Sequence, residues 1–186
     1  MPYPQHVDDD SYTLLTLPGI KSALERVEEE LRIAVKAEEP LLTKLSRHLI
    51  DAGGKRIRPS LAIASSQILE NKPVTPSQEV ILGGVAVELV HQGSLYHDDV
   101  MDGAKTRRNV KSVNEEWGNH EAILGGDYLL ARSSELAAES LGLESVKLLA
   151  STYAQLVEGQ TKEVQFSFDT KPVSYTHLTQ PTNREV

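Results

Sequence analysis

Apolar residues recur every three or four positions along most of the chain, which is the spacing of the apolar face of an α-helix. The first such stretch predicts a helix from about residue 20 to residue 35. Pro40 is well placed to begin a second helix, which Gly53 and Gly54 end. Further helices are predicted over about residues 60–69, 77–100, 121–141 and 145–168.

The residues between these helices support the same division. Ser77 is a suitable N-cap for the longest predicted helix, and Pro73 and Pro76 end the helix before it. Residues 103–118 are polar and basic and are expected to be irregular, and no two strands joined by a tight turn can be recognised. The pattern therefore predicts an all-α protein.

The composition is that of an ordinary globular protein. The chain has 186 residues, and its 19 Lys and Arg against 27 Asp and Glu give a net charge of −8, which argues against a nucleic-acid-binding surface. The absence of cysteine excludes disulfides, thiolate metal sites and cysteine nucleophiles, and a cytoplasmic location is expected. The longest uncharged stretches, residues 60–69 and 80–87, are shorter than the roughly 20 apolar residues of a transmembrane helix.

The two ends of the chain differ from its helical part. Residues 1–19 contain three prolines and are expected to form a loose leader. Residues 172–186 read PVSYTHLTQPTNREV and have no helical period. A native tail is one interpretation. We favour the other, a foreign tail, because the string resembles a translated sequencing adapter. Residues 20–171 are then the folded part.

Two carboxylates, Asp98 and Asp102, are four residues apart at the end of the longest predicted helix, so they lie on one face, one turn apart. A hard divalent cation would relieve their repulsion, and Mg²⁺ commonly takes one or two carboxylates together with substrate phosphates. Asp99 is rotated by about 100° from Asp98, so it is expected to orient water or a ligand rather than bind the same metal. The alternative is a solvated acidic helix end.

Two arginines, Arg107 and Arg108, follow this acidic motif closely. Arginine binds phosphate through two parallel hydrogen bonds, so carboxylates for Mg²⁺ beside two arginines favour a diphosphate site. The alternative is a loop in which these charges only pair with one another.

A second basic cluster lies at residues 53–59, which read GGKRIRP. Its Lys55, Arg56 and Arg58 follow two glycines, so little side-chain bulk prevents an anion from approaching the backbone. His91 lies two helical turns before the first carboxylate of the acidic motif and could donate a hydrogen bond to a phosphate. The alternatives are a solvated turn for the basic cluster and a core histidine at position 91.

The chain resembles the N-terminal half of a trans-polyprenyl diphosphate synthase on four motifs that occur in order: GGKRIRP, ELVHQGSLYHDDVMD, TRR and WGNHEAILGGDYLLARS. The resemblance covers about residues 20–168. It implies a helical bundle of the isoprenoid synthase type around a deep central cavity, usually in a homodimer. It also implies an Mg²⁺-dependent reaction that condenses isopentenyl diphosphate with an allylic prenyl diphosphate, head to tail.

The resemblance further implies roles for individual residues. Asp98 and Asp102 would hold Mg²⁺ on the allylic diphosphate, and Arg107 would bind the same diphosphate. Asp99 would belong to the motif without a firm direct role. The residues that would bind isopentenyl diphosphate are Lys55, Arg58, His91 and Arg108.

The product length is also expected from the resemblance. In the family, large side chains just before the first acidic motif stop the growing tail. The fifth and fourth positions before Asp98 are the small residues Gly93 and Ser94. We therefore expect a product longer than farnesyl diphosphate, and we expect Gly93→Phe to shorten it.

The chain departs from the family in one respect. Family members are nearly twice as long and carry a second Asp-rich motif, whereas no adjacent pair of aspartates follows Asp102. A truncated and poorly active form of the enzyme is therefore expected. One alternative is a non-catalytic subunit that regulates a partner synthase, although such subunits tend to lose the acidic motif. The other is a terpene cyclase, which has no need for a second diphosphate site.

Overall fold

The computed structural model describes residues 19–70 and 75–166. Most of the predicted leader and the whole of the predicted foreign tail, residues 172–186, lie outside this range. The described residues form helices α1 to α7 and one short pair of strands. The helices are α1 (Ile20–Ala34), α2 (Pro40–Asp51), α3 (Ile57–Glu70), α4 (Gln78–Asp102), α5 (Val113–Glu116), α6 (Asn119–Ser140) and α7 (Leu143–Phe166). The prediction of an all-α fold is confirmed.

The chain divides into two compact units, residues 1–150 and residues 151–186. In the second unit, the described residues 151–166 continue α7 as a regular helix. No helix in the described ranges is long and apolar enough to cross a membrane. All the candidate site residues belong to the first unit.

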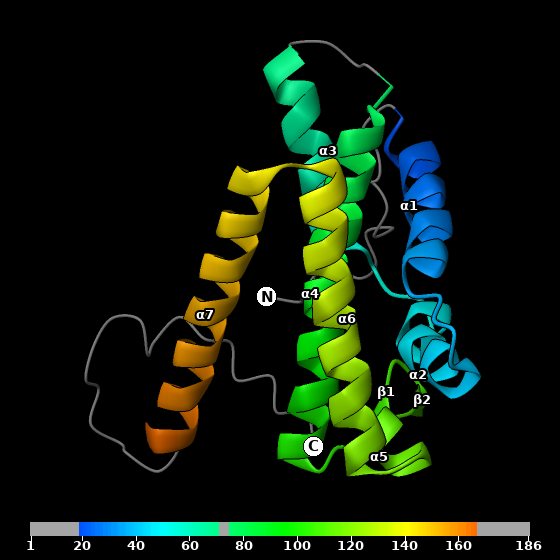
Figure 1. The fold of residues 1–186 in the computed structure, drawn as a ribbon, viewed down its shortest axis with the longest axis vertical. Coiled ribbons are helices and arrows are strands. Elements are labelled where there is room, and N and C mark those ends of the chain that lie inside the picture. Colours follow the sequence, from blue (N-terminus) through cyan, green and yellow to red (C-terminus); the bar gives the residue numbers. More distant parts are fainter. Residues whose placement is uncertain (1–18, 71–74, 167–186) are drawn as a thin grey trace, which may run out of the picture. The chain divides into compact units, whose positions relative to one another are not determined.

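The first unit is built around α4 and α6, which run side by side (Figure 1). Helices α1 and α3 also pack on α4, and α2 and α5 pack on α6. Burial of apolar side chains between helices is the main force that stabilises such an arrangement. The core contains residues from α1 to α6, among them Val27, Leu31, Leu49, Ile63, Val85, Leu89, Val113 and Leu129.

Glycines allow α4 and α6 to approach closely. An ideal Cβ on Gly93 would lie 3.0 Å from the carbonyl oxygen of Gly126 and 3.1 Å from Cγ of Leu130. The backbones of the two helices are therefore nearly in contact at this point, which a larger side chain at either glycine would prevent.

The boundaries of α4 set the geometry of the acidic motif. Ser77 is its N-cap, as predicted, and the Ser77 hydroxyl accepts a hydrogen bond from the amide of Val80 at 3.4 Å. Gly103 ends the helix in the left-handed conformation, with φ of 61°. The helix therefore continues through both Asp98 and Asp102.

The expectation that residues 103–118 are irregular is wrong in part, because they contain a short strand pair and the short helix α5. Strand β1 (Thr106–Arg107) pairs antiparallel with β2 (Val110–Lys111), with Arg107 opposite Val110. Both turn residues, Arg108 and Asn109, have positive φ, at 54° and 63°. Tight turns of this kind normally contain glycine, so the Arg-Asn sequence and the two-residue strands gave no recognisable signal.

Candidate functional site

The last turns of α4, which we call the acidic turn, carry Asp98, Asp99 and Asp102, and of the three only Asp99 is ion-paired with a described residue, Arg107. Neither Asp98 nor Asp102 makes a hydrogen bond or ion pair with another described residue. Burial raises the pKa of Asp98, and the charge of Asp102 raises it further. The carbonyl end of a helix carries a partial negative charge, and the last turn of α4 has no basic residue to balance it. The site therefore favours a cation.

Asp99 has a different environment from its two neighbours in the motif. It is 1% exposed, and its Oδ1 accepts hydrogen bonds from Nε of Arg107 at 2.8 Å and from Nη2 at 2.5 Å. Its Oδ2 is buried and has no hydrogen-bond partner among the described residues. The hydrogen bonds to Asp99 raise the pKa of the Arg107 guanidinium. The sequence analysis gave pairing among these charges only as an alternative and did not single out Asp99, because the hairpin that brings Arg107 back to α4 was not recognised.

The next residue, Arg108, is held by a different part of the fold. Its Nη1 donates to the carbonyl oxygen of Leu49 at 2.7 Å and to that of Gly53. Its Nη2 lies 3.9 Å from Oε1 of Glu88. Burial, and then the charge of Arg56, lower the pKa of Arg108. In this structure the residue therefore anchors the segment between α2 and α3.

Arg56 is the basic residue of the GGKRIRP motif that turns inward. It is 5% exposed and has a left-handed backbone, with φ of 47°. Its guanidinium forms ion pairs with Glu28 and Glu88, and it donates to the carbonyl oxygen of Ile50 at 3.0 Å. Arg56 is therefore part of the buried scaffold, a role that the sequence analysis did not distinguish from those of its neighbours.

The other basic residues of the motif, Lys55 and Arg58, face the solvent. Neither side chain makes a hydrogen bond or ion pair with another residue in the described ranges, so both are available to an anion. The first helical turn of α3 contains Arg58, because α3 begins at Ile57, three residues before the predicted start.

His91 lies within the electrostatic range of Arg58, Arg107 and Arg108, and we call these four residues the arginine cluster. Burial lowers the pKa of His91 to about 4, and the charges of the arginines contribute to the shift, beginning with Arg58. Its imidazole is therefore neutral near pH 7 and can still donate a hydrogen bond. The charges of Arg58, Arg107 and Arg108 thus act on His91, and that of Arg107 acts on Asp98 as well.

The two small residues that were predicted to set the product length have different surroundings. Gly93 packs directly against Gly126 and Leu130 of α6. The expected shortening of the product by Gly93→Phe stays a prediction, and a phenyl group at this position would also disturb the contact between the two helices. Ser94 is only partly buried, and its hydroxyl donates to the carbonyl oxygen of His91 at 2.9 Å.

The acidic turn fits Mg²⁺ in part. Asp98 and Asp102 supply two hard oxygen donors without competing partners, and Mg²⁺ often takes two carboxylates together with waters and substrate phosphates. In the described parts of the chain, no group of three or more His, Asp or Glu side chains could enclose a metal ion. The residues present therefore supply at most two protein ligands, and waters or a substrate diphosphate would complete the coordination of Mg²⁺.

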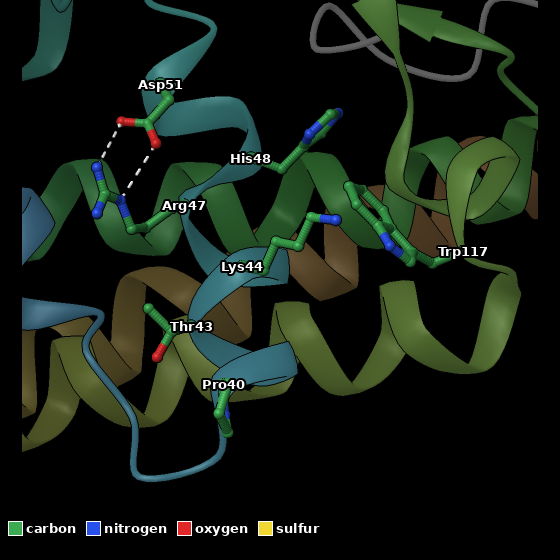
Figure 2. Close-up of a pocket in the computed structure, with 7 residues that line it drawn as sticks. All are labelled: Pro40, Thr43, Lys44, Arg47, His48, Asp51 and Trp117. Carbon is green, nitrogen blue, oxygen red and sulfur yellow. Dashed lines mark hydrogen bonds and ion pairs between the residues drawn. The ribbon is translucent and has the colours of Figure 1, made fainter.

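A separate pocket of about 470 Å³ lies on the outer side of α2 (Figure 2). Nζ of Lys44 lies 5.4 Å from the centre of the Trp117 ring. The centre of the His48 ring lies 4.8 Å from the same point, and the two rings meet edge to face. Nε of Arg47 lies 3.1 Å from Oδ2 of Asp51, one turn further along the same face of α2. The pocket contains none of the predicted site residues.

Comparisons with known proteins agree with the four motifs. A family model described as polyprenyl synthetase matches residues 39–182. Nonaprenyl diphosphate synthase from Mycobacterium tuberculosis is 42% identical over 79% of this chain and 43% of its own length. Heptaprenyl diphosphate synthase component 2 from Geobacillus stearothermophilus is 36% identical over 78% of this chain and 45% of its own length.

A solved structure agrees with the fold. The polyprenyl synthase from Caulobacter crescentus, crystallised with calcium and isoprenyl diphosphate, superimposes with a TM-score of 0.73 at 30% identity. The match covers 80% of this chain and 44% of that one. The chain thus spans less than half the length of these relatives. The motifs, the helical fold and these matches together show that the chain belongs to the polyprenyl synthetase family.

Proposed function

We propose that this chain is part of a prenyltransferase that condenses isopentenyl diphosphate with an allylic prenyl diphosphate, head to tail. The observation that carries the proposal is the pair Asp98 and Asp102, which lack partners and lie beside the arginine cluster. A surface that needs a cation next to one that needs an anion is suited to a metal–diphosphate complex.

The acidic turn would serve the allylic substrate. Asp98 and Asp102 would hold Mg²⁺, which would stabilise the negative charge that develops on the diphosphate as the allylic C–O bond breaks. Arg107 binds the same diphosphate. The relative from Caulobacter crescentus was crystallised with calcium and isoprenyl diphosphate, which supports a divalent cation of this kind.

The remaining basic residues would hold isopentenyl diphosphate. Lys55 and Arg58 offer side chains without competing partners, His91 donates from a neutral imidazole, and Arg108 completes the set. Only Nη1 of Arg108 donates to backbone carbonyls, so the other nitrogens of its guanidinium remain available to a phosphate. The reaction needs no protein nucleophile, because the double bond of isopentenyl diphosphate attacks the allylic cation and a proton is then lost.

The test is the binding of isopentenyl diphosphate to the chain, measured by calorimetry without metal. We expect Arg58→Gln to weaken binding by about tenfold, the loss of one or two charge-assisted hydrogen bonds. The matched control is Arg47→Gln, which removes an exposed arginine of α2 that pairs with Asp51. Equal binding by the wild type and both variants would contradict the assignment.

We also propose a product longer than farnesyl diphosphate. Ser94 is small, and the relatives named above include nonaprenyl and heptaprenyl synthases. Because Gly93 is part of the packing between α4 and α6, Ser94→Phe is the better test. We expect this substitution, introduced into the complete prenyltransferase of which the chain is part, to give shorter products, as measured by chromatography of the dephosphorylated lipids. An unchanged product length would exclude Ser94 as a determinant.

A homodimer and a cytoplasmic location complete the proposal. The second candidate is a subunit of a heteromeric synthase, which is favoured by the relative named heptaprenyl diphosphate synthase component 2. Light scattering of the purified chain tests the homodimer. Condensation that requires an added partner subunit would favour the heteromer.

A further inference from the structure

We propose that Asp99 is a positioning residue, whose carboxylate holds the Arg107 guanidinium beside Asp98 and Asp102 and does not bind the metal. The inference rests on the proposed function, since it assigns Arg107 the task of binding a diphosphate.

The three aspartates of the motif differ in their exposure to solvent, and this difference distinguishes their roles. Asp102 is exposed and Asp98 is partly buried, whereas Asp99 is 1% exposed. A metal that keeps several of its waters needs ligands that the solvent can reach. Asp99 does not meet this condition, and its Oδ1 already accepts two hydrogen bonds from Arg107.

The contact also leaves part of Arg107 available. Nε and Nη2 donate to Asp99, while Nη1 makes no hydrogen bond to any residue in the described ranges. The Arg107 side chain is still 30% exposed. Asp99 thus fixes one edge of the guanidinium, and the remaining donors can meet a phosphate without a further loss of side-chain freedom.

The backbone around Asp99 would keep the hairpin in place without its carboxylate. The carbonyl oxygen of Asp99 accepts hydrogen bonds from the amide of Ala104 at 2.9 Å and from Nδ2 of Asn114 at 3.2 Å. Nδ2 of Asn114 also donates to the carbonyl oxygen of Ala104 at 2.9 Å. The variant Asp99→Asn therefore keeps these backbone hydrogen bonds and loses mainly the ion pair with Arg107.

The experiment separates positioning from metal binding. Mn²⁺ binding to the chain alone is measured by electron paramagnetic resonance, and inorganic diphosphate binding in the presence of Mn²⁺ is measured by calorimetry. We expect Asp99→Asn to leave the Mn²⁺ affinity unchanged and to weaken diphosphate binding by about tenfold. The double variant with Arg107→Gln should bind no more weakly than Arg107→Gln alone, because Asp99 acts through Arg107. Asp51→Asn, which breaks exposed pairs with Arg32 and Arg47, is the matched control.

Other outcomes decide against the inference. A fall in Mn²⁺ affinity would make Asp99 a metal ligand, and an undiminished diphosphate affinity would remove its positioning role. Additive losses in the double variant would show that Asp99 does not act through Arg107. A wild-type chain that binds Mn²⁺ but no diphosphate would instead contradict the proposed function, and the inference with it.

A measurement on the wild-type chain covers the case in which Asp99→Asn fails to fold. The Nε–H resonance of Arg107 should be protected from solvent exchange in the nuclear magnetic resonance spectrum, both without and with diphosphate. Rapid exchange of this proton would overturn the inference without any variant.

Discussion

Nη1 of Arg56 donates to Oε1 of Glu88 at 3.1 Å inside the protein, where both side chains are nearly inaccessible to solvent. Arg56 lies between α2 and α3, and Glu88 lies on α4. Arg56 also binds Glu28 of α1, so one guanidinium joins the segment that carries Lys55 and Arg58 to two other helices. The basic motif is therefore held in place from within the fold.

Removal of this guanidinium should be strongly destabilising. We expect Arg56→Met to lower the free energy of unfolding by about 3–5 kcal/mol, because Glu88 is left as a buried charge without its main partner. Urea unfolding measures the change. The double variant Arg56→Met/Glu88→Gln should recover part of the loss. A loss below about 1 kcal/mol, the usual value of an exposed ion pair, would contradict the account of this network.

The two glycines before Lys55 should differ in their tolerance of alanine. Gly53 has φ of 86° and open space around its Cβ position, so Gly53→Ala should cost only the backbone strain of about 1–2 kcal/mol. Gly54 has φ of 146°, and an ideal Cβ there would lie 3.0 Å from Cζ of Arg108 and 3.1 Å from Nη1 of Arg56. Gly54→Ala should therefore destabilise more in the same urea assay and should also weaken isopentenyl diphosphate binding. Equal effects of the two changes would show that the arginines do not pack against the loop.

The charges of the acidic turn should lower the stability of the metal-free chain, although they are needed to bind the metal. The raised pKa of Asp98 means that its ionisation destabilises the folded chain as the pH rises through that pKa. At pH 7 without metal, Asp98→Asn should therefore stabilise the chain by about 0.5–1 kcal/mol, from relief of like-charge repulsion and of the unfavourable helix end. The melting temperature in EDTA measures this gain. With Mg²⁺ and diphosphate added, only the wild type should gain further stability. A variant less stable than the wild type in EDTA would contradict this explanation.

His91 should make the chain sensitive to mild acid. Its pKa of about 4 in the folded state lies below the ordinary value of 6.5. The unfolded chain therefore takes up a proton before the folded chain does, and stability is lost as the pH falls from about 6.5 towards 4. Between pH 7 and pH 5 the wild type should lose about 1–2 kcal/mol more than His91→Gln. A bound diphosphate should raise the pKa of His91, which nuclear magnetic resonance of the ring can follow. Identical pH profiles of the two proteins would contradict the assigned environment.

Local patterns predicted the helices and part of the site. The four-residue spacing of Asp98 and Asp102 is a property of one helix, and the Ser77 cap depends on residues within one turn. Such features need no knowledge of the tertiary structure, and for this reason the all-α fold and the acidic turn could be derived from the sequence.

The tertiary contacts of the arginines could not be predicted in this way. The partners of Arg56 are Glu28 and Glu88, 28 and 32 residues away in the sequence. Its inward orientation also depends on a positive φ at a residue other than glycine, which sequence patterns do not indicate. In the same way, Arg107 reaches Asp99 only because a hairpin turns at two residues without glycine.

Gly93 shows a different limit of prediction from the sequence. Its small size was predicted from the family resemblance to leave room for a long product, whereas the structure uses it for the contact with Gly126. Room for a long product and close packing of two helices both favour glycine, so the residue type alone could not distinguish the two roles.

The central claim is that the acidic turn and the arginine cluster together bind a metal–diphosphate complex. Calorimetric titration of the chain with inorganic diphosphate, with and without Mg²⁺, tests it most directly. We predict that Mg²⁺ adds a binding event to the metal-free binding at the basic residues, and that this event is lost in Asp98→Ala and in Asp102→Ala, while the exposed control Asp127→Ala binds like the wild type. A titration that is the same with and without Mg²⁺, or a Mg²⁺-dependent event that survives both substitutions in the acidic turn, would contradict the claim.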